Sequence, residues 1–318
     1  MERIAVIDIG TNTALLLIAD LDHKTNRVVP VLGRQEIIRL GRGVDENRVI
    51  HKVALERLMI CLENYRTVIY EQGVSRIIAT GTSALRDAAN REEILNEVKR
   101  NAGINIELLS GEAEAELTFK GAIAGFSNLP SRMLVLDIGG GSTEIVLGSP
   151  TQVIEMTSID IGSVRISERF FKHSPPTDEE FAAAKAFLTV EFANQLSHFI
   201  TARENVFAVA GTATTVAQLV QGHQVYLPEA IHGYALRYEN TRALLEILKQ
   251  CSASEIEEMG VNHGRADVIT AGALILHQFM RIFGSKQVTV SDQGLRYGVA
   301  MRELSNAAPK VFRSQVAS

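Results

Sequence analysis

Apolar and polar positions along the first third of the chain predict a sheet with covering helices. Residues 4–7, 15–19 and 28–38 are apolar runs that follow one another closely, which is typical of consecutive strands in a meander. Between residues 52 and 71 the apolar positions recur at helical spacing, and Gly73 ends this pattern. The next pattern predicts a strand, a helix and a strand at residues 76–80, 91–101 and 104–109. Strands that alternate with helices indicate the α/β class.

The second half of the chain repeats this order. Three strands are predicted at residues 134–138, 144–147 and 153–159, followed by a helix over residues 178–201 that Thr177 caps. A strand at residues 206–210 comes next, followed by a turn at Gly211-Thr212 and a further helix. Later helices are expected at residues 241–251 and 267–283, and a last strand is expected at residues 287–290. The tail after residue 306 shows no period. The repeat predicts two domains, residues 1–124 and 125–318, with a ligand cleft between them.

Two similar loops follow the first strand of each half. One is Asp8-Ile9-Gly10-Thr11-Asn12-Thr13, and the other is Asp137-Ile138-Gly139-Gly140-Gly141-Ser142-Thr143-Glu144. Small residues let backbone N–H groups approach phosphate oxygens, and a carboxylate can hold a divalent cation. In the alternative interpretation, each aspartate only caps its own turn. Because the pattern occurs twice, we expect both loops to bind phosphate, with Asp137 and Glu144 as candidate magnesium ligands.

Arg86 and three glutamates are the next candidates. Arg86 follows the strand that ends at residue 80, so it is placed to grip a phosphate, unless it only pairs with Asp87 or a helix carboxylate. Ser110 is expected to cap a helix with Glu112, Glu114 and Glu116 near its start. Glu112, Glu116 and Lys120 share one face of that helix, whereas Glu114 points to the opposite side. Glu114 is therefore the candidate general base.

Several polar segments of the second half remain open at this stage. Gly211 and Thr212 open a helix after a buried strand, so they either contact a phosphate or form a capped turn. Arg265 and Arg296 lie in Gly-bearing polar segments, and they either line the cleft or tie helices together. Spacing alone does not decide between these alternatives.

Composition limits the function classes. The chain has 318 residues with a net charge of −5, which argues against general nucleic-acid binding. Cys61 and Cys251 are isolated, and no histidine precedes an aspartate as in the metal motif of many phosphohydrolases. No apolar run approaches the roughly 18 residues of a membrane span, and no signal peptide is evident. We expect a cytoplasmic protein with no membrane partner.

Five motifs in order resemble the exopolyphosphatase/guanosine-pentaphosphate phosphatase (Ppx/GppA) family of the actin-like superfamily. They cover most of the chain: residues 8–13, 82–88, 110–115, 137–144 and 291–296. The resemblance implies two RNase H-like domains, with a C-terminal helix at about 296–306 that returns to the first domain. Two positions depart from the family pattern, because Ala113 and Tyr297 stand where an acid is usual.

The resemblance also implies residue roles and a reaction. Glu114 corresponds to the catalytic glutamate, Arg86 to the phosphate-binding arginine, and Asp137 and Glu144 to the metal-associated acids. We expect magnesium-assisted hydrolysis of a terminal phosphoanhydride bond in inorganic polyphosphate or guanosine pentaphosphate. A small-molecule kinase that uses ATP and a non-catalytic nucleotide or polyphosphate sensor are the alternatives. A homodimer is the default expectation for the oligomeric state.

Overall fold

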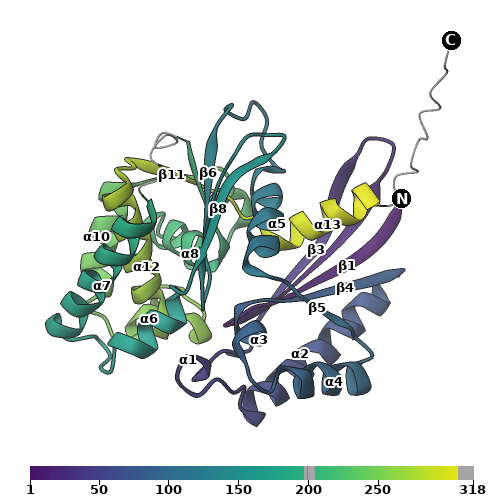
Figure 1. The fold of residues 1–318 in the computed structure, drawn as a ribbon, viewed down its shortest axis with the longest axis horizontal. Helices are drawn as coiled ribbons and strands as arrows, with labels where there is room; N and C mark the ends of the chain where they lie inside the picture. The colour runs from purple at the N-terminus through teal and green to yellow at the C-terminus, as the bar shows by residue number, and fades with distance from the viewer. Residues whose placement is uncertain (197–198, 200–204, 307–318) are drawn as a thin grey trace.

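The computed structural model describes residues 1–196, 199 and 205–306, and it contains two mixed sheets with helices around them (Figure 1). The first sheet has the order β3-β2-β1-β4-β5, formed by β1 (Glu2–Ile9), β2 (Thr13–Asp22), β3 (Arg27–Ile37), β4 (Arg76–Gly81) and β5 (Ile106–Leu108). The second has the order β10-β11-β9-β6-β7-β8, formed by β6 (Met133–Ile138), β7 (Thr143–Gly148), β8 (Val153–Ile159), β9 (Val206–Val209), β10 (Ala235–Arg237) and β11 (Gln287–Val290). The predicted α/β class is confirmed.

The two sheets are built in the same way around β1 and β6. Each of these strands pairs antiparallel with the next strand along the chain and parallel with a later strand that returns through a helical crossover. Asp8 and Asp137 lie at the carboxyl-terminal ends of β1 and β6. In open α/β sheets this end of the strands is where ligands bind, so the topology places both aspartates at candidate ligand sites.

Helices cover the outer faces of both sheets. The first sheet packs against α2 (Lys52–Glu71) and α4 (Arg91–Ala102), with the short helices α1 (Val44–Asn47) and α3 (Ser83–Asp87) at its edge. The second half adds eight helices within the described residues: α6 (Ser163–Phe170), α7 (Asp178–Leu196), α8 (Ala210–Val220), α9 (Pro228–Ile231), α10 (Tyr238–Leu248), α11 (Ala253–Glu258), α12 (His263–Phe283) and α13 (Leu295–Asn306).

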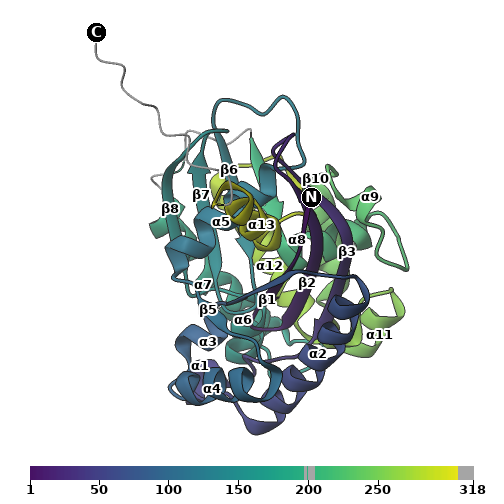
Figure 2. The same ribbon diagram turned by 90° about the vertical axis from the view of Figure 1, so that its right-hand side faces the viewer.

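Two helices lie side by side between the sheets, α5 (Gly111–Ile123) and α13 (Figures 1 and 2). Leu295, Val299 and Leu304 of α13 pack on the first sheet, although α13 comes at the end of the second half. Phe119 and Ile123 of α5 pack on the second sheet. Each helix therefore covers the sheet of the opposite half. The domain boundary between residues 124 and 125 stays a prediction.

Helix α12 corrects one expectation from the sequence. It has 21 residues, and its most apolar 18-residue window has a mean hydropathy of 1.2, so by length and composition it could span a membrane. However, 83% of that window is buried inside the protein. The expectation that no segment approaches this length is wrong, because a helix enclosed on nearly all sides is as apolar as a membrane span.

Other boundaries differ from the prediction by a few residues. Gly211 and Thr212 do not form a turn between strand and helix, since α8 already begins at Ala210. The short helices α1, α3, α6, α9 and α11 and the strand β10 were not predicted, because so few residues show no recognisable period. The predicted helix end near residue 201 and the tail after residue 306 lie outside the described residues.

Candidate active site

The two Asp-led loops share one hydrogen-bonded turn. The Gly10 N–H donates to the carbonyl of Thr13 over 3.0 Å, and the Gly139 N–H donates to the carbonyl of Ser142 over the same distance. The intervening amide groups, among them those of Gly140 and Gly141, have no hydrogen-bond acceptor among the described residues. Each loop thus presents backbone donors that an anion can use.

Small side chains are required because the loops of the two halves nearly touch. A Cβ atom added at Gly141 would lie 2.3 Å from the Ser83 Oγ and 2.9 Å from the Thr11 Oγ1. One added at Gly140 would lie 2.9 Å from the Cβ of Thr11. A larger residue at either position would push the first half away from the second. The glycines therefore determine how closely the walls of the cleft approach each other.

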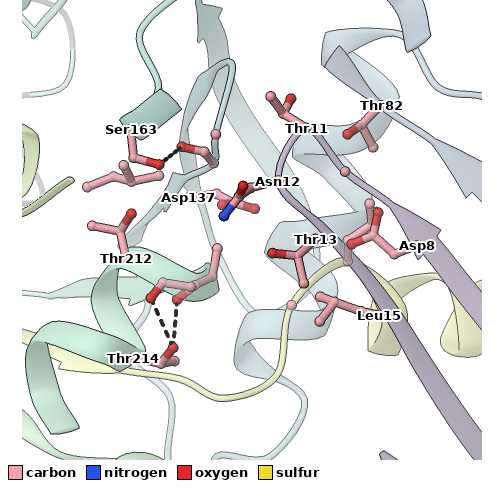
Figure 3. A pocket seen from close by; sticks show the side chains of 18 of the residues that line it. Asp8, Thr11, Asn12, Thr13, Leu15, Thr82, Asp137, Ser163, Thr212 and Thr214 are labelled. Carbon is pink, nitrogen blue, oxygen red and sulfur yellow. Dashed lines mark hydrogen bonds between the residues drawn. The ribbon is translucent and has the colours of Figure 1, made fainter. Parts of the chain in front are cut away.

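The cleft between the halves brings almost all predicted site residues together. Figure 3 shows Thr11, Asn12 and Thr13 of the first loop on one side, opposite Asp137 and Thr212. The lining contains every residue predicted to bind phosphate except Arg86, together with two further acids: Asp8, Gly10, Thr11, Asn12, Thr13, Gly139, Gly140, Gly141, Ser142, Gly211, Thr212, Glu114 and Asp137. Arg86 and Glu144 are not among the lining residues, and each contacts the site from behind.

Glu114 enters the cleft from the first turn of α5. The Ser110 side chain caps this helix by accepting a hydrogen bond from the Ala113 N–H, as the sequence predicts. Glu116 is exposed and pairs with Lys120 over 2.6 Å, whereas Glu114 is only 7% exposed. The separation of the glutamates onto opposite faces is confirmed, and it leaves Glu114 as the one that reaches the cleft.

Arg86 holds the Glu114 carboxylate. Its guanidinium donates to Glu114 Oε2 over 3.0 Å and to the backbone carbonyl of Leu109 over 3.0 Å. The alternative that Arg86 pairs with Asp87 is wrong, because Asp87 accepts a hydrogen bond from Arg165 instead. The other alternative, a helix carboxylate, describes the contact, but that carboxylate is the candidate general base.

Four carboxylic acids at this site have pKa values raised above their usual range. Burial is the main cause that raises the pKa of Glu114 and of Glu144 to about 8 each. Burial also raises the pKa of Asp8 to about 6, although Arg296 opposes this. The pKa of Asp137 is well above its usual range because of burial and the neighbouring Glu144 and Asp8. Such perturbed acids in a cleft are a common sign of a functional site.

The residues present suit a magnesium ion. Asp8 Oδ1 is buried without a hydrogen-bond partner, which also argues against Asp8 as a simple cap of its own turn. Burial disfavours the charged forms of Asp8, Asp137 and Glu144, and a bound cation would offset that cost. Residues 1–196 and 205–306 include no cage of three or more His, Cys, Asp or Glu ligands. Magnesium commonly needs only one or two carboxylates, because water and substrate phosphates complete its shell.

Asn12 and Arg296 join the two halves at the cleft, and Arg265 joins two helices of the second half. The Asn12 amide donates to the Gly264 carbonyl of the second half over 3.0 Å, so its side chain ties the halves together. Arg265 donates to the Thr215 Oγ1 over 3.0 Å, and Arg296 donates to the Leu16 carbonyl over 3.1 Å. Both arginines line the cleft, and Arg265 also ties α12 to α8, so both alternatives left open by the sequence apply to Arg265.

Some lining residues received no individual role from the sequence, although Thr82, Ser83 and Asp292 lie in family motifs: Thr82, Ser83, Ser163, Thr214, Tyr226 and Asp292. Ser83 and Thr82 follow β4, at the strand end where a ligand is expected, so their position was available as a signal. Tyr226 donates a hydrogen bond to Asp292, a residue 66 positions away, and nothing in the sequence connects these two.

A family model, the Ppx/GppA phosphatase family, matches residues 17–307. The chain belongs to this family. A solved structure of the Aquifex aeolicus member of the Ppx/GppA family is 33% identical, with a TM-score of 0.78 over 96% of this chain and 98% of that one. The family resemblance is thereby confirmed, and the solved family member shares the fold of this chain.

Relatives of this Ppx/GppA family member include named enzymes. Exopolyphosphatase 2 of Mycobacterium tuberculosis is 33% identical, and the match covers 95% of this chain and 98% of that protein. A bifunctional 3-dehydroquinate synthase/phosphatase of Fusobacterium nucleatum is also 33% identical. That match covers 95% of this chain but 46% of the relative, so the chain spans about half the length of that protein.

Proposed function

We propose that this Ppx/GppA family member hydrolyses the terminal phosphoanhydride bond of inorganic polyphosphate and releases orthophosphate. The observation that carries this proposal is the buried Glu114 carboxylate in a cleft between two loops with free backbone donors. Relatives named exopolyphosphatase, such as that of Mycobacterium tuberculosis, support the choice of substrate.

Glu114 orients the attacking water and accepts its proton. A general base works best when its pKa lies near the working pH, and burial raises the pKa of Glu114 to about 8. The hydrogen bond from Arg86 fixes one carboxylate oxygen and leaves the other for a water molecule. Arg86 thus acts on the base, and its charge opposes the effect of burial on the Glu114 pKa.

The two loops supply the binding and charge stabilisation. Within residues 10–13 and 139–142, the backbone N–H groups that the turns leave free, those of Thr11, Asn12, Gly140 and Gly141, donate to the oxygens of the terminal phosphoryl group, which carry the charge of the transition state. Asp137 is the residue that would hold magnesium in the cleft, with Asp8 facing it and Glu144, the other candidate ligand, behind it. The bound ion would offset phosphate charge during phosphoryl transfer.

A substrate panel tests the proposal. Purified protein with magnesium is incubated with polyphosphate of graded chain length, guanosine pentaphosphate, and ATP with candidate acceptors, and released orthophosphate is measured. We expect release from polyphosphate. Guanosine pentaphosphate carries the same terminal bond, so its hydrolysis would extend the proposal to the second activity in the family name. Formation of ADP with a phosphorylated acceptor would favour a kinase instead, and tight binding without turnover would favour a sensor.

A further inference from the structure

Arg165 joins both halves of the molecule behind the cleft. It lies on α6, and its side chain is 6% exposed. Its Nε donates to the carbonyl of Gly141 in the second phosphate loop over 2.8 Å. Its two terminal nitrogens donate to carboxylates of the first half, one to Asp45 and the other to Asp87 over 2.8 Å. One buried cation therefore contacts a phosphate loop and two acids of the opposite half.

Neighbouring residues reinforce the same junction. Arg169, one turn further along α6, binds both oxygens of Asp45 over 2.5 and 2.9 Å. These contacts hold the pKa of the Asp45 carboxyl below its usual value, through the Arg169 hydrogen bond and the charge of Arg165. Glu168 accepts a hydrogen bond from the Gly43 N–H at the start of α1 over 3.0 Å. We call Arg165, Asp45 and Asp87 the interlobe clamp.

The clamp reaches the candidate catalytic group through α3. Asp87 is the last residue of α3, and Arg86 directly precedes it. Arg86 in turn holds Glu114 over 3.0 Å. A shift of α3 would therefore move the arginine that orients the base. Since misplacement of a reacting group by about 1 Å can slow a reaction on the order of a hundredfold, this connection has a kinetic consequence.

We propose that Arg165 is a positioning residue that closes the two halves on each other and sets Arg86 beside Glu114. The part that concerns Glu114 rests on the proposed hydrolysis. Arg165 suits this task because its planar guanidinium engages a carbonyl and two carboxylates at once, whereas a lysine offers a single charge. Without Arg165, Asp87 would remain as a half-buried carboxylate with no partner, and that cost favours separation of the halves.

Two readouts test the clamp, namely kcat for phosphate release and the radius of gyration from solution X-ray scattering. For Arg165→Ala we expect a larger radius of gyration and a kcat lowered about 10- to 100-fold, with a smaller change in KM. Arg165→Lys should recover part of both losses. Arg302→Ala is the matched control, because Arg302 also binds a first-half carboxylate, Glu107, bidentately over 2.9 and 2.8 Å, yet it does not line the cleft. Both readouts should stay at the wild-type value in this control.

The outcomes separate the parts of the proposal. A scattering curve of Arg165→Ala identical to that of the wild type overturns the clamp. If Arg165→Ala has a larger radius of gyration but the same kcat as Arg302→Ala, the proposed link to Arg86 is overturned. If Arg165→Ala does not fold, Asp87→Asn removes the same ion pair from the other side and is judged by the same two readouts. If the wild type releases no phosphate from any substrate, the proposed function fails. The radius of gyration of Arg165→Ala then still tests whether Arg165 holds the two halves together.

Discussion

The buried Glu144 carboxyl gives a direct test of the electrostatics of the site. The ordinary pKa of this group is 4.5, and burial together with the Glu114 charge raises it to about 8. Because the folded protein holds this proton more tightly than the unfolded chain does, the contribution of Glu144 to the free energy of unfolding must fall as the pH rises from about 4.5 to 8. Substitution Glu144→Gln removes this titration but keeps an oxygen that can accept the 2.7 Å hydrogen bond from Ser158.

The expected size of the effect follows from the same numbers. A pKa raised from 4.5 to about 8 corresponds to on the order of 5 kcal/mol at most, and movement of water and side chains will reduce it. We therefore expect the variant to gain roughly 2–4 kcal/mol relative to the wild type between pH 5 and pH 8.5.

Urea unfolding at several pH values in the presence of a chelator measures this difference. The chelator keeps divalent ions from neutralising the cluster. Glu116→Gln is the matched control, because Glu116 is exposed and pairs with Lys120 on the outer face of α5. Its pH dependence should equal that of the wild type. If the free energy of unfolding changes with pH in the same way in the wild type and in Glu144→Gln, the reasoning is refuted.

Three further predictions concern the cation, the glycines and the core. Magnesium at pH 8 should stabilise the wild type by about 3 kcal/mol at a hundredfold excess over its Kd, and Asp137→Asn should lose most of this gain in thermal unfolding. Gly141→Ala should lower kcat about 100-fold, because the added Cβ would clash with Ser83. Gly33→Ala is the matched control and should keep wild-type activity, because a Cβ added at Gly33 meets no atom nearer than 3.9 Å. Tyr65→Phe should cost about 1 kcal/mol in urea unfolding, because it removes the 2.7 Å hydrogen bond to the Ala14 carbonyl.

Local patterns in the sequence predicted most of the fold and part of the site. The duplicated loops pointed to two equivalent central strands, and helical geometry singled out Glu114 among its neighbours. Both inferences depend only on residues that are close in the chain. Residue ranges of the long strands and helices were predictable for the same reason, since their apolar faces repeat over many residues.

Long-range contacts were not predictable. Arg165 meets Asp45 and Asp87 across 120 and 78 positions, and no periodic pattern marks such a pair. The partner of Arg86 is 28 residues away, so the sequence offered Asp87 or an unspecified helix carboxylate and did not single out Glu114. The exchange of α5 and α13 between the sheets follows from packing between distant segments. Such contacts arise only once the chain has folded.

The central claim is that the Glu114 carboxylate activates water between the two loops. Its most direct test compares the wild type, Glu114→Gln and Glu116→Gln in phosphate release from polyphosphate with magnesium, together with the Kd for the same polymer. We expect kcat to fall at least about 100-fold in Glu114→Gln, while the Kd stays similar and Glu116→Gln matches the wild type. Equal turnover by Glu114→Gln and the wild type would contradict the account.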